Sequence, residues 1–536
     1  MHDILVRGGM LIDGTGAPAT PMDLAIDGPK IAGIYKRAEA KALLSLDATE
    51  MVVCPGFVDI HSHSDIHLLA NPLAESKIMQ GVTTELVGNC GSSAAPLLGT
   101  AKTATKEFAE DLYVDVDWTT MDEYLLRLNN MKTSVNVCTL IGAETVRKSV
   151  LGDDDVRPSV EQLDQMRSLV ADGMLAGAYG VSSGLIYAPG CYATTEELIA
   201  LASTAASFGG MYASHIRGEG RTLIKAVAEA ITIGREAHAR VEISHHKACG
   251  PANWGKVKET LEMITQARAE GVDVAFDVYP YTASCTSLDA ILPPWAREGG
   301  KESVLSRLQD PELHARIARE LETPSEDWEA VAAESDWDAI TLIDFKNESN
   351  KKFENRSVLS IAKEIGKDPT ETALGLISDE KLRVSAIFHE INEEDVLRVI
   401  SNPLGAIGSD GCAEKPYGPD SESATHPRAY GTFPRVLRRY VIDTKALSME
   451  EALRKMTSAP AERIGLGDRG VLAKGMAADV VVLDPSKIRD RATFENSHLY
   501  PEGIEYVIVN GAITVDKGKH TMERNGFVLR HKPSIA

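Results

Sequence analysis

The chain has 536 residues, enough to bury a large core and to form more than one domain. Its 56 basic and 78 acidic residues give a net charge of −22, which argues against nucleic acid and anionic membranes as partners. Hydrophobic residues make up 43% of the chain and charged residues 25%, as in an ordinary soluble globular protein.

The cysteines, the apolar runs and the first residues of the chain bear on its cellular compartment. The seven cysteines are odd in number and include no CxxC pair, so they do not predict a disulfide framework. The sequence contains no run of 18 or more apolar residues that would predict a transmembrane helix. The first residues predict a strand rather than a secretion signal. We therefore expect a cytoplasmic protein.

Residues 1–55 predict short strands joined by tight turns. Residues 24–26 and 31–34 flank the turn Asp27-Gly28 and predict a hairpin. The strands predict a small β-sandwich. Because about 55 residues give such a fold little core of its own, we expect this segment to be only part of it.

Residues 56–465 alternate between apolar, strand-like pieces and helical segments. One helix is expected from Thr195, after the capping pattern that begins at Thr194. The candidate strands are the stretch that begins at Gly56 and residues 82–87, 135–140, 180–183, 211–215, 241–245, 274–278, 384–388 and 405–409. Repeated βα units over about 250 residues or more predict an α/β protein with a (β/α)₈, TIM-like barrel.

One region interrupts this rhythm. Residues 288–350, approximately, are rich in Glu, Asp and Arg and show helix-like stretches without a clear barrel strand. An insertion after a barrel strand lies at the face where active sites form, so we expect a lid or pocket wall near the active-site mouth. A solvated surface excursion is the alternative.

Residues 466–536 return to strands and hairpin turns. Residues 478–484 and 507–509 are strand-like, and the turn Asn510-Gly511 leads into residues 512–515. Residues 1–55 and 466–536 are each too small to form a stable domain alone. They predict one β-sandwich domain built from both termini.

Residue types that bind metals recur where the predicted barrel strands end. His61 and His63 are two positions apart on an extended chain, so both imidazoles can face one metal ion. Alone, each candidate is a weak signal. A lone cysteine after a strand is usually a buried apolar residue, a lone histidine is usually structural, and Ser-Asp-Gly is usually a turn. Their recurrence at one end of successive βα units favours a Zn²⁺ site. The later candidates are Cys90, His215, His245 or its neighbour His246, and Asp410.

Five motifs in this order resemble those of the N-acyl-D-amino-acid deacylases (D-aminoacylases) of the amidohydrolase superfamily. The resemblance covers nearly the whole chain. It implies a barrel flanked by a small β-sandwich, and zinc-dependent hydrolysis that releases a carboxylate and a free D-amino acid from N-acyl-D-amino acids. The motifs are His61-Ser62-His63, Gly88-Asn89-Cys90-Gly91, Ser214-His215-Ile216-Arg217, Ser244-His245-His246-Lys247 and Gly408-Ser409-Asp410-Gly411.

The resemblance also implies two metal positions. The tightly held Zn²⁺ would lie on Cys90, His215 and His245. A second, weaker position would use His61, His63 and Asp410 and share the Cys90 thiolate, which takes the place of the carboxylated lysine common in the superfamily. Zinc in such a site supplies hydroxide at neutral pH and polarises the amide carbonyl. Asp410 would be the catalytic base that later protonates the departing amine.

The small-molecule substrate needs cationic and hydroxyl groups for its free carboxylate. By resemblance, the candidates are Lys247, Tyr281, Ser284 and Arg428, with Tyr187 near the scissile amide.

Two features of the sequence bear on which amino-acid side chain the substrate carries: the insertion, and one residue that departs from the family pattern. Residues 292–295, Leu-Pro-Pro-Trp, look like a hydrophobic wall and resemble relatives that take apolar D-amino acids. Arg297 leaves an N-acyl-D-glutamate or N-acyl-D-aspartate deacylase open. Ala143 stands where many relatives carry histidine, a departure that bears on specificity rather than on the metal ligands.

Three other readings remain. A cyclic-amide hydrolase is disfavoured because such an enzyme would be expected to use a lysine where this chain has Cys90. A D-dipeptidase-like amidohydrolase stays open. A non-catalytic barrel scaffold is disfavoured because all six candidate ligands are present.

Overall fold

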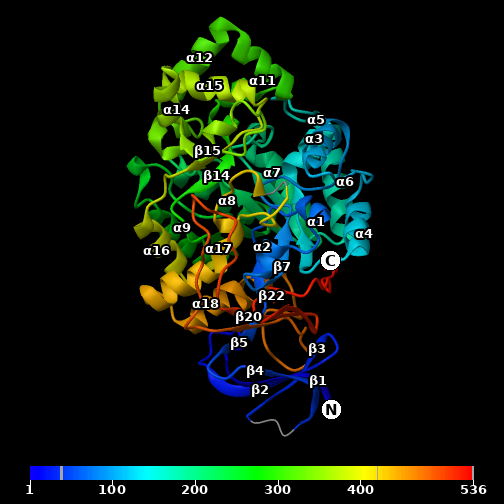
Figure 1. Cartoon of the computed structure of the whole chain (residues 1–536). Helices are drawn as coiled ribbons and strands as arrows, with labels where there is room; N and C mark the ends of the chain where they lie inside the picture. Colours follow the sequence, from blue (N-terminus) through cyan, green and yellow to red (C-terminus); the bar gives the residue numbers. More distant parts are fainter. Residues whose placement is uncertain (37–39, 419–420, 534–536) are drawn as a thin grey trace.

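The structure is a computed structural model that describes residues 1–36, 40–418 and 421–533. A β-sheet domain built from strands near both ends of the sequence lies at one end of the molecule, and a largely helical insertion lies at the other (Figure 1). The barrel lies between them.

The β-sheet domain joins strands from the two ends of the chain. Its nine strands follow the order β22-β21-β20-β19-β5-β1-β2-β3, with β4 paired to β1. The two halves meet where β5 pairs antiparallel with β19, with Val53 opposite Val482. Both ends also share one apolar core. The strands are β1 (His2–Leu11), β2 (Thr20–Asp27), β3 (Lys30–Tyr35), β4 (Ala42–Asp47), β5 (Val52–Pro55), β19 (Val480–Leu483), β20 (Ile504–Val509), β21 (Ala512–Asp516) and β22 (Lys519–His520).

The barrel is a ring of parallel strands, with β8 and β9 forming one strand interrupted at Leu140. The strands are β6 (Phe57–Asp59), β7 (Val82–Val87), β8 (Asn136–Thr139), β9 (Ile141–Gly142), β10 (Gly180–Gly184), β11 (Met211–His215), β12 (Arg240–Ile243), β13 (Val274–Val278) and β18 (Gly405–Ile407). Their ladders form two arcs, β6-β7-β8 and β9-β10-β11-β12-β13-β18. At the β18–β6 seam, the backbone N–H of Asp410 donates to the carbonyl of His61 at 2.8 Å. A parallel bridge also joins Ser62 to Gly411 there. The TIM-like barrel predicted from the sequence is therefore present.

Helices follow the strands and bury one face against them. In α8, for example, Val227, Ala230 and Ile231 are buried at helical spacing. The predicted cap of α7 is present, since the Glu197 N–H donates to Thr194 Oγ1 at 3.2 Å. The helices outside the insertion are α1 (His67–Ala70), α2 (Glu75–Ile78), α3 (Gly99–Asp111), α4 (Met121–Met131), α5 (Ala143–Leu151), α6 (Val160–Ala176), α7 (Thr195–Ser207), α8 (Leu223–Ala237), α9 (Val257–Ala269), α16 (Glu393–Ser401), α17 (Arg428–Arg435), α18 (Met449–Met456) and α19 (Ser458–Ile464).

The insertion is a unit with its own antiparallel sheet, in the order β14-β17-β15-β16, and its own apolar core. The prediction that residues 384–388 form a barrel strand is wrong, because β17 pairs with β14 and β15 of this sheet. The insertion thus continues well beyond residue 350. Its elements are β14 (Ser284–Ser287), α10 (Pro294–Arg297), α11 (Gly300–Gln309), α12 (Pro311–Leu321), α13 (Val331–Glu334), β15 (Ile340–Ile343), β16 (Arg356–Ser357), α14 (Val358–Ile365), α15 (Pro369–Asp379) and β17 (Ser385–Phe388).

No helix in the described part of the chain is both long and apolar enough to cross a membrane.

Candidate metal centre and substrate cavity

A cavity of about 500 Å³ opens where the barrel strands end beneath the insertion. Its wall includes Cys90, His215, His245 and Asp410 from the barrel. Ile291, Val331 and Phe388 of the insertion also line it, so the insertion forms part of the pocket wall, as one reading of the sequence predicts.

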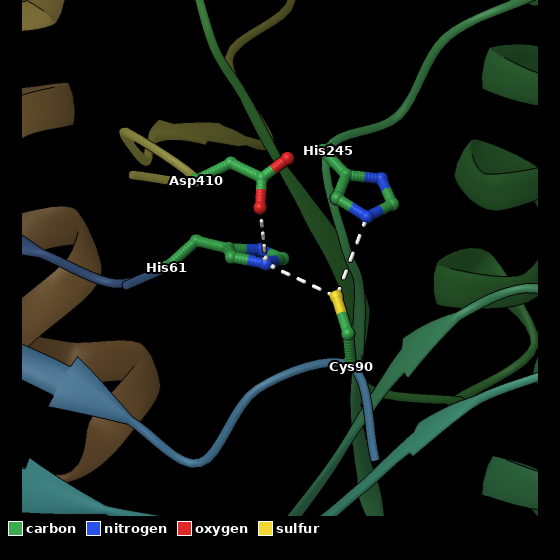
Figure 2. Close-up of side chains that lie close together, drawn as sticks. All are labelled: His61, Cys90, His245 and Asp410. Carbon is green, nitrogen blue, oxygen red and sulfur yellow. Dashed lines mark hydrogen bonds and ion pairs between the residues drawn. The ribbon is translucent and has the colours of Figure 1, made fainter. Parts of the chain in front are cut away.

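The thiol of Cys90 lies between two imidazoles (Figure 2). Its Sγ is 3.3 Å from Nε2 of His61 and 3.5 Å from Nε2 of His245. Ligand atoms of these three residues and of Asp410 all lie within 4.8 Å of one another. Residues from four separate strand ends therefore offer a sulfur, two nitrogens and an oxygen to one point.

Asp410 connects this group to two further side chains. Its Oδ1 is 3.3 Å from Nε2 of His61 and 3.0 Å from Nε2 of His63. Its Oδ2 forms an ion pair with Nη1 of Arg428 at 2.7 Å. Burial raises the pKa of Asp410, but Arg428 and His61 outweigh burial and hold that pKa well below its usual value. The carboxylate is thus ionised.

Cys90, His245 and Asp410 share an unusual backbone conformation, with φ of 48°, 38° and 54°. The left-handed region costs a residue with a Cβ on the order of 1–3 kcal/mol, and such strain clusters at functional sites. Each of these residues follows a barrel strand, where the turn aims its side chain into the cavity. The adjacent His246 is not in the group, since its Nε2 lies 2.8 Å from Thr260 Oγ1. The structure therefore favours His245 over His246.

Buried carboxylates fix the rings of the two histidines beside Cys90. The Nδ1 of His61 donates to Asp277 at 3.1 Å, and the backbone N–H of His245 donates to the same carboxylate at 2.8 Å. The Nδ1 of His245 is 3.0 Å from Oε1 of Glu219 and 2.9 Å from Nζ of Lys247, which itself pairs with Glu219. A carboxylate on Nδ1 orients the ring and makes Nε2 a better metal ligand. Both histidines therefore present Nε2 to the sulfur.

The ring of His215 packs against that of His245. Their ring centroids are 4.4 Å apart in an edge-to-face arrangement. Ligand atoms of His215, Glu219 and His245 also lie within 4.8 Å of one another. Neither ring nitrogen of the buried His215 makes a hydrogen bond within the described part of the chain, although Nε2 lies 3.7 Å from Oε2 of Glu219. A buried imidazole without a hydrogen bond is costly, so His215 is suited to a ligand that the protein itself does not supply.

The donors together suit a borderline-soft divalent cation such as Zn²⁺. Burial raises the pKa of the Cys90 thiol, but His61 and His245 outweigh it and hold the pKa well below its usual value. The thiolate, which is the form that binds metals, is therefore favoured. The division into a tight and a weaker position stays a prediction.

A fully buried lysine supports the strand ends that carry His61 and Asp410. The Nζ of Lys77 lies 2.9 Å from Asp59 Oδ2 and donates to Ser409 Oγ at 2.7 Å. The backbone N–H of Ser409 donates to Asp59 Oδ1 at 2.8 Å. This network ties β6 to the segment after β18 and so holds the seam of the barrel in register.

Two cationic side chains lie near one tyrosine ring at one side of the cavity. Lys247 Nζ lies 5.6 Å from the centre of the Tyr279 ring, and the Arg428 guanidinium lies 5.1 Å from it. The buried Tyr279 hydroxyl has no hydrogen-bond partner among the described residues. The predicted substrate residue Tyr281 does not line the cavity, because its hydroxyl donates to the carbonyl of Pro427 at 3.2 Å. Tyr279 lines the cavity instead.

The remaining predicted substrate residues line the cavity but already have partners. Ser284 Oγ donates to Glu390 at 2.8 Å. The Tyr187 hydroxyl lies 3.1 Å from Thr286 Oγ1, and the Tyr187 ring packs edge-on against His215. Tyr187 is thus close to the metal ligands.

The predicted hydrophobic wall is wrong in its residues. Leu292 packs into the core of the insertion, and Trp295 donates from Nε1 to Glu320. The apolar part of the wall comes from Ile291, Val331 and Phe388. Arg297 is buried and does not line the cavity.

At the start of α5, the residue that reaches the cavity is Glu144 rather than Ala143. Ala143 is buried, whereas Glu144 lines the cavity. Glu144 Oε1 accepts the Gly184 N–H at 2.9 Å, and Oε2 has no hydrogen-bond partner in the described chain. A Cβ at Gly91 would collide with this carboxyl group, which explains the glycine after Cys90.

Four residues at the site were not predicted from the sequence: Asp277, Glu219, Tyr279 and Glu144. Asp277 and Tyr279 lie at the end of the predicted strand 274–278, where the strand-end argument could have found them. Glu219 follows His215 by four residues in a loop, and no periodicity marks it.

Comparison with known proteins gives full-length matches. The amidohydrolase family model matches residues 45–334 and 408–515. N-acyl-D-glutamate deacylase of Alcaligenes xylosoxydans xylosoxydans is 35% identical over 537 residues, covering 100% of this chain and 98% of the relative. D-aminoacylase of the same organism is 35% identical over 98% of this chain and 97% of its own length. The crystal structure of N-acyl-D-glutamate deacylase from Bordetella bronchiseptica, complexed with zinc and a phosphonate inhibitor that mimics the tetrahedral intermediate, superposes with a TM-score of 0.83. It is 32% identical and covers 99% of both chains.

Proposed function

The chain belongs to the amidohydrolase family, with deacylases of N-acyl-D-amino acids among its full-length relatives, and from this we propose that it hydrolyses N-acyl-D-amino acids with zinc. The products are a carboxylate and a free D-amino acid. The observation that carries the proposal is the Cys90 thiol between Nε2 of His61 and Nε2 of His245, with Asp410 beside them.

Two sets of residues would hold the metal. Cys90, His215 and His245 are proposed as the tight site, and His61, His63 and Asp410 as the weaker one, with Cys90 shared. Bound zinc supplies hydroxide at neutral pH and polarises the amide carbonyl.

Lys247, Tyr279 and Arg428 bind the α-carboxylate of the substrate. Two cations and a free hydroxyl converge on one side of the cavity, which suits charge-assisted hydrogen bonds to a carboxylate. This anchor would hold the scissile amide close to the proposed metal ligands.

Asp410 moves the proton. Its carboxylate is ionised and lies beside the metal ligands, so it can accept a proton from the attacking water. It then delivers that proton to the amide nitrogen, which is too basic to leave as an anion. Arg428, paired with Asp410 at 2.7 Å, keeps this carboxylate aligned between the metal ligands and the carboxylate receptor.

The choice of Cys90 favours this function over cyclic-amide hydrolysis, for which a carboxylated lysine would be expected to bridge the metals. A D-dipeptidase would need room for a second residue and an acceptor, such as a carboxylate, for the amino group of that residue. A scaffold protein would have no reason to keep three strained residues at the strand ends.

Metal analysis and one enantiomer pair test the proposal. We expect zinc in the purified protein and at least about 100-fold higher kcat/KM for N-acetyl-D-methionine than for N-acetyl-L-methionine, equivalent to about 2.7 kcal/mol. A preference for the L enantiomer, or hydrolysis of dihydroorotate or a hydantoin in place of the linear amide, would contradict it.

A further inference from the structure

One face of helix α3 forms part of the cavity wall. Ala101, Ala104, Thr105 and Phe108 line the cavity, and their spacing of three and four residues places them on one side of the helix. The buried residues of α3 are Ala101 and Ala109, whereas Ala104 and Phe108 are exposed. The protein therefore leaves much of this face, which we call the α3 face, uncovered.

Phe108 is the largest side chain of the α3 face. It is 49% exposed, and its ring packs edge-on against His67, with centroids 5.8 Å apart. His67 lines the cavity as well. A single exposed aromatic ring on a protein surface is ordinary. This ring, however, is held by a neighbour at the wall of a cavity, where an apolar ligand would cover it.

The α3 face belongs to the same cavity as the candidate metal ligands. The wall continues from Cys90 through residues 91–94, and α3 begins five residues later at Gly99. Helix α5 fixes the start of α3, since the Leu98 N–H donates to Ser149 Oγ at 3.3 Å and Thr100 Oγ1 donates to the Lys148 carbonyl at 3.2 Å. A chain attached to an amide at the metal ligands can thus extend toward α3 within one cavity.

Polar groups on the segments beside α3 already have partners in the protein. The Nζ of Lys148 pairs with Asp153 at 2.9 Å. The Ser93 N–H donates to Thr145 Oγ1 at 2.9 Å, and Ser93 Oγ donates to the Ala95 carbonyl at 2.6 Å. These groups need nothing from a ligand, so the α3 face is suited to apolar contact rather than to hydrogen bonding.

We propose that the α3 face binds an extended alkyl chain of the substrate. This rests on the proposed function and assigns as preferred substrates N-acyl-D-amino acids that carry such a chain, on the acyl group or on the amino acid. The cavity, at about 500 Å³, is within the size range of sites that bind drug-sized ligands. Each methylene that it buries should raise affinity about fourfold.

The test compares two long substrates with N-acetyl-D-alanine, which is short at both branches. N-octanoyl-D-alanine lengthens the acyl group, and N-acetyl-D-α-aminononanoate adds the same number of methylenes to the side chain. For the zinc-loaded enzyme we expect kcat/KM for one or both to exceed that of N-acetyl-D-alanine by at least about 30-fold, as burial of roughly half the added methylenes predicts.

Two variants of the α3 face should reduce this preference. Phe108→Ala removes the largest apolar contact, and Ala104→Glu places a carboxylate that an alkyl chain would desolvate. We expect the ratio of long to short substrate to fall at least about fivefold in each. Thr103→Glu is the matched control, exposed on the same helix and outside the described cavity lining, and should keep the ratio. Because the ratio is measured on one preparation, partial loss of folded enzyme cancels.

The substrate whose ratio falls identifies the source of the chain, and a fall for either supports the inference. Wild-type ratios below about 30 for both long substrates overturn it, as does a preference that neither variant lowers or that Thr103→Glu lowers equally. In those cases, continued hydrolysis of N-acetyl-D-methionine over its L enantiomer would leave the proposed function standing. If no N-acyl-D-amino acid is hydrolysed, the proposed function fails, and the inference with it.

Discussion

His61 and Asp277 are 216 residues apart in the chain, yet Nδ1 of the imidazole donates to the carboxylate at 3.1 Å. The same carboxylate accepts the backbone N–H of His245. One buried side chain thus fixes the ring of one candidate ligand and the backbone of another, and both present Nε2 to Cys90. We therefore expect the metal centre to depend on a residue outside its proposed ligand set.

Replacement of Asp277 should therefore weaken metal binding. Loss of a carboxylate behind a metal-bound histidine typically costs 10–100-fold in affinity or activity. We expect Asp277→Ala to lower zinc affinity by about that range, measured by competition with a chromophoric chelator. Asp273→Ala, at an exposed position just before the same strand, is the control and should keep wild-type affinity. Equal affinities in the two variants would contradict the role of Asp277.

Zinc titration can separate the two proposed metal positions. His215→Ala should lose the tight first equivalent, because His215 belongs to the proposed tight site. His61→Ala should keep that equivalent and lose only weaker binding. Calorimetry on metal-free protein gives both stoichiometry and affinity. If His61→Ala loses the first equivalent and His215→Ala keeps it, the ranking of the sites is reversed.

Asp410→Asn should retain metal and lose turnover. The amide keeps the shape of the side chain but cannot take a proton, and general acid–base catalysis contributes typically 10²–10⁴-fold. We expect kcat to fall by about that factor while zinc content, measured by elemental analysis, stays near that of the wild type. A variant with nearly full kcat would remove Asp410 from the proton-transfer role.

Tyr279 and Tyr281 offer a matched pair for the carboxylate receptor. Tyr279→Phe removes a hydroxyl that has no hydrogen-bond partner among the described residues, so a loss must come from the substrate. We expect KM to rise about tenfold with little change in kcat, as for an interaction of equal strength in ground and transition states. Tyr281→Phe should leave KM within about twofold and lower stability by about 1 kcal/mol, since its hydroxyl bonds Pro427. The reverse pattern would restore Tyr281 to the substrate site.

The buried Glu144 makes stability depend on pH. Burial raises the pKa of its carboxyl from 4.5 to about 8. Between these values the folded state holds a proton that the unfolded state has lost, so this contribution to stability is present below pH 4.5 and falls as pH rises toward 8. Glu144→Gln removes the dependence. Its melting temperature, relative to the wild type, should rise between pH 5 and pH 8.5, whereas Glu262→Gln on the exposed face of α9 should show no such trend. A difference in melting temperature between Glu144→Gln and the wild type that does not change with pH would contradict this role of Glu144.

The alternation of strands and helices made the barrel and most of its strand ends predictable. Side chains alternate along a strand, and parallel strands end at one edge, so the sequence alone was enough to group the candidate ligands. Those residues are His61, Cys90, His215, His245 and Asp410. The five motifs, in the same order as in the family, then indicated the family.

Other features depend on contacts that the sequence does not encode locally. Residues 384–388 have the same apolar character as a barrel strand, and only pairing with β14 and β15 assigns them to the insertion. Tyr279 and Tyr281 lie on either side of Pro280 just past a strand, and the path of that segment decides which one enters the cavity. Asp277 and Glu219 act through histidines distant in sequence.

The pairing of β5 with β19 also means that the first strand is synthesised long before its partner. Val53 and its partner Val482 are separated by the whole barrel and insertion. At about 5–20 residues per second, the ribosome needs about 20 seconds to a minute and a half to deliver the second strand after the first. During that time the edge of β5 is unpaired and open to other chains. We therefore expect yield in cells to depend on chaperones that shield the nascent N-terminal strands, more than the stability of the finished fold would suggest.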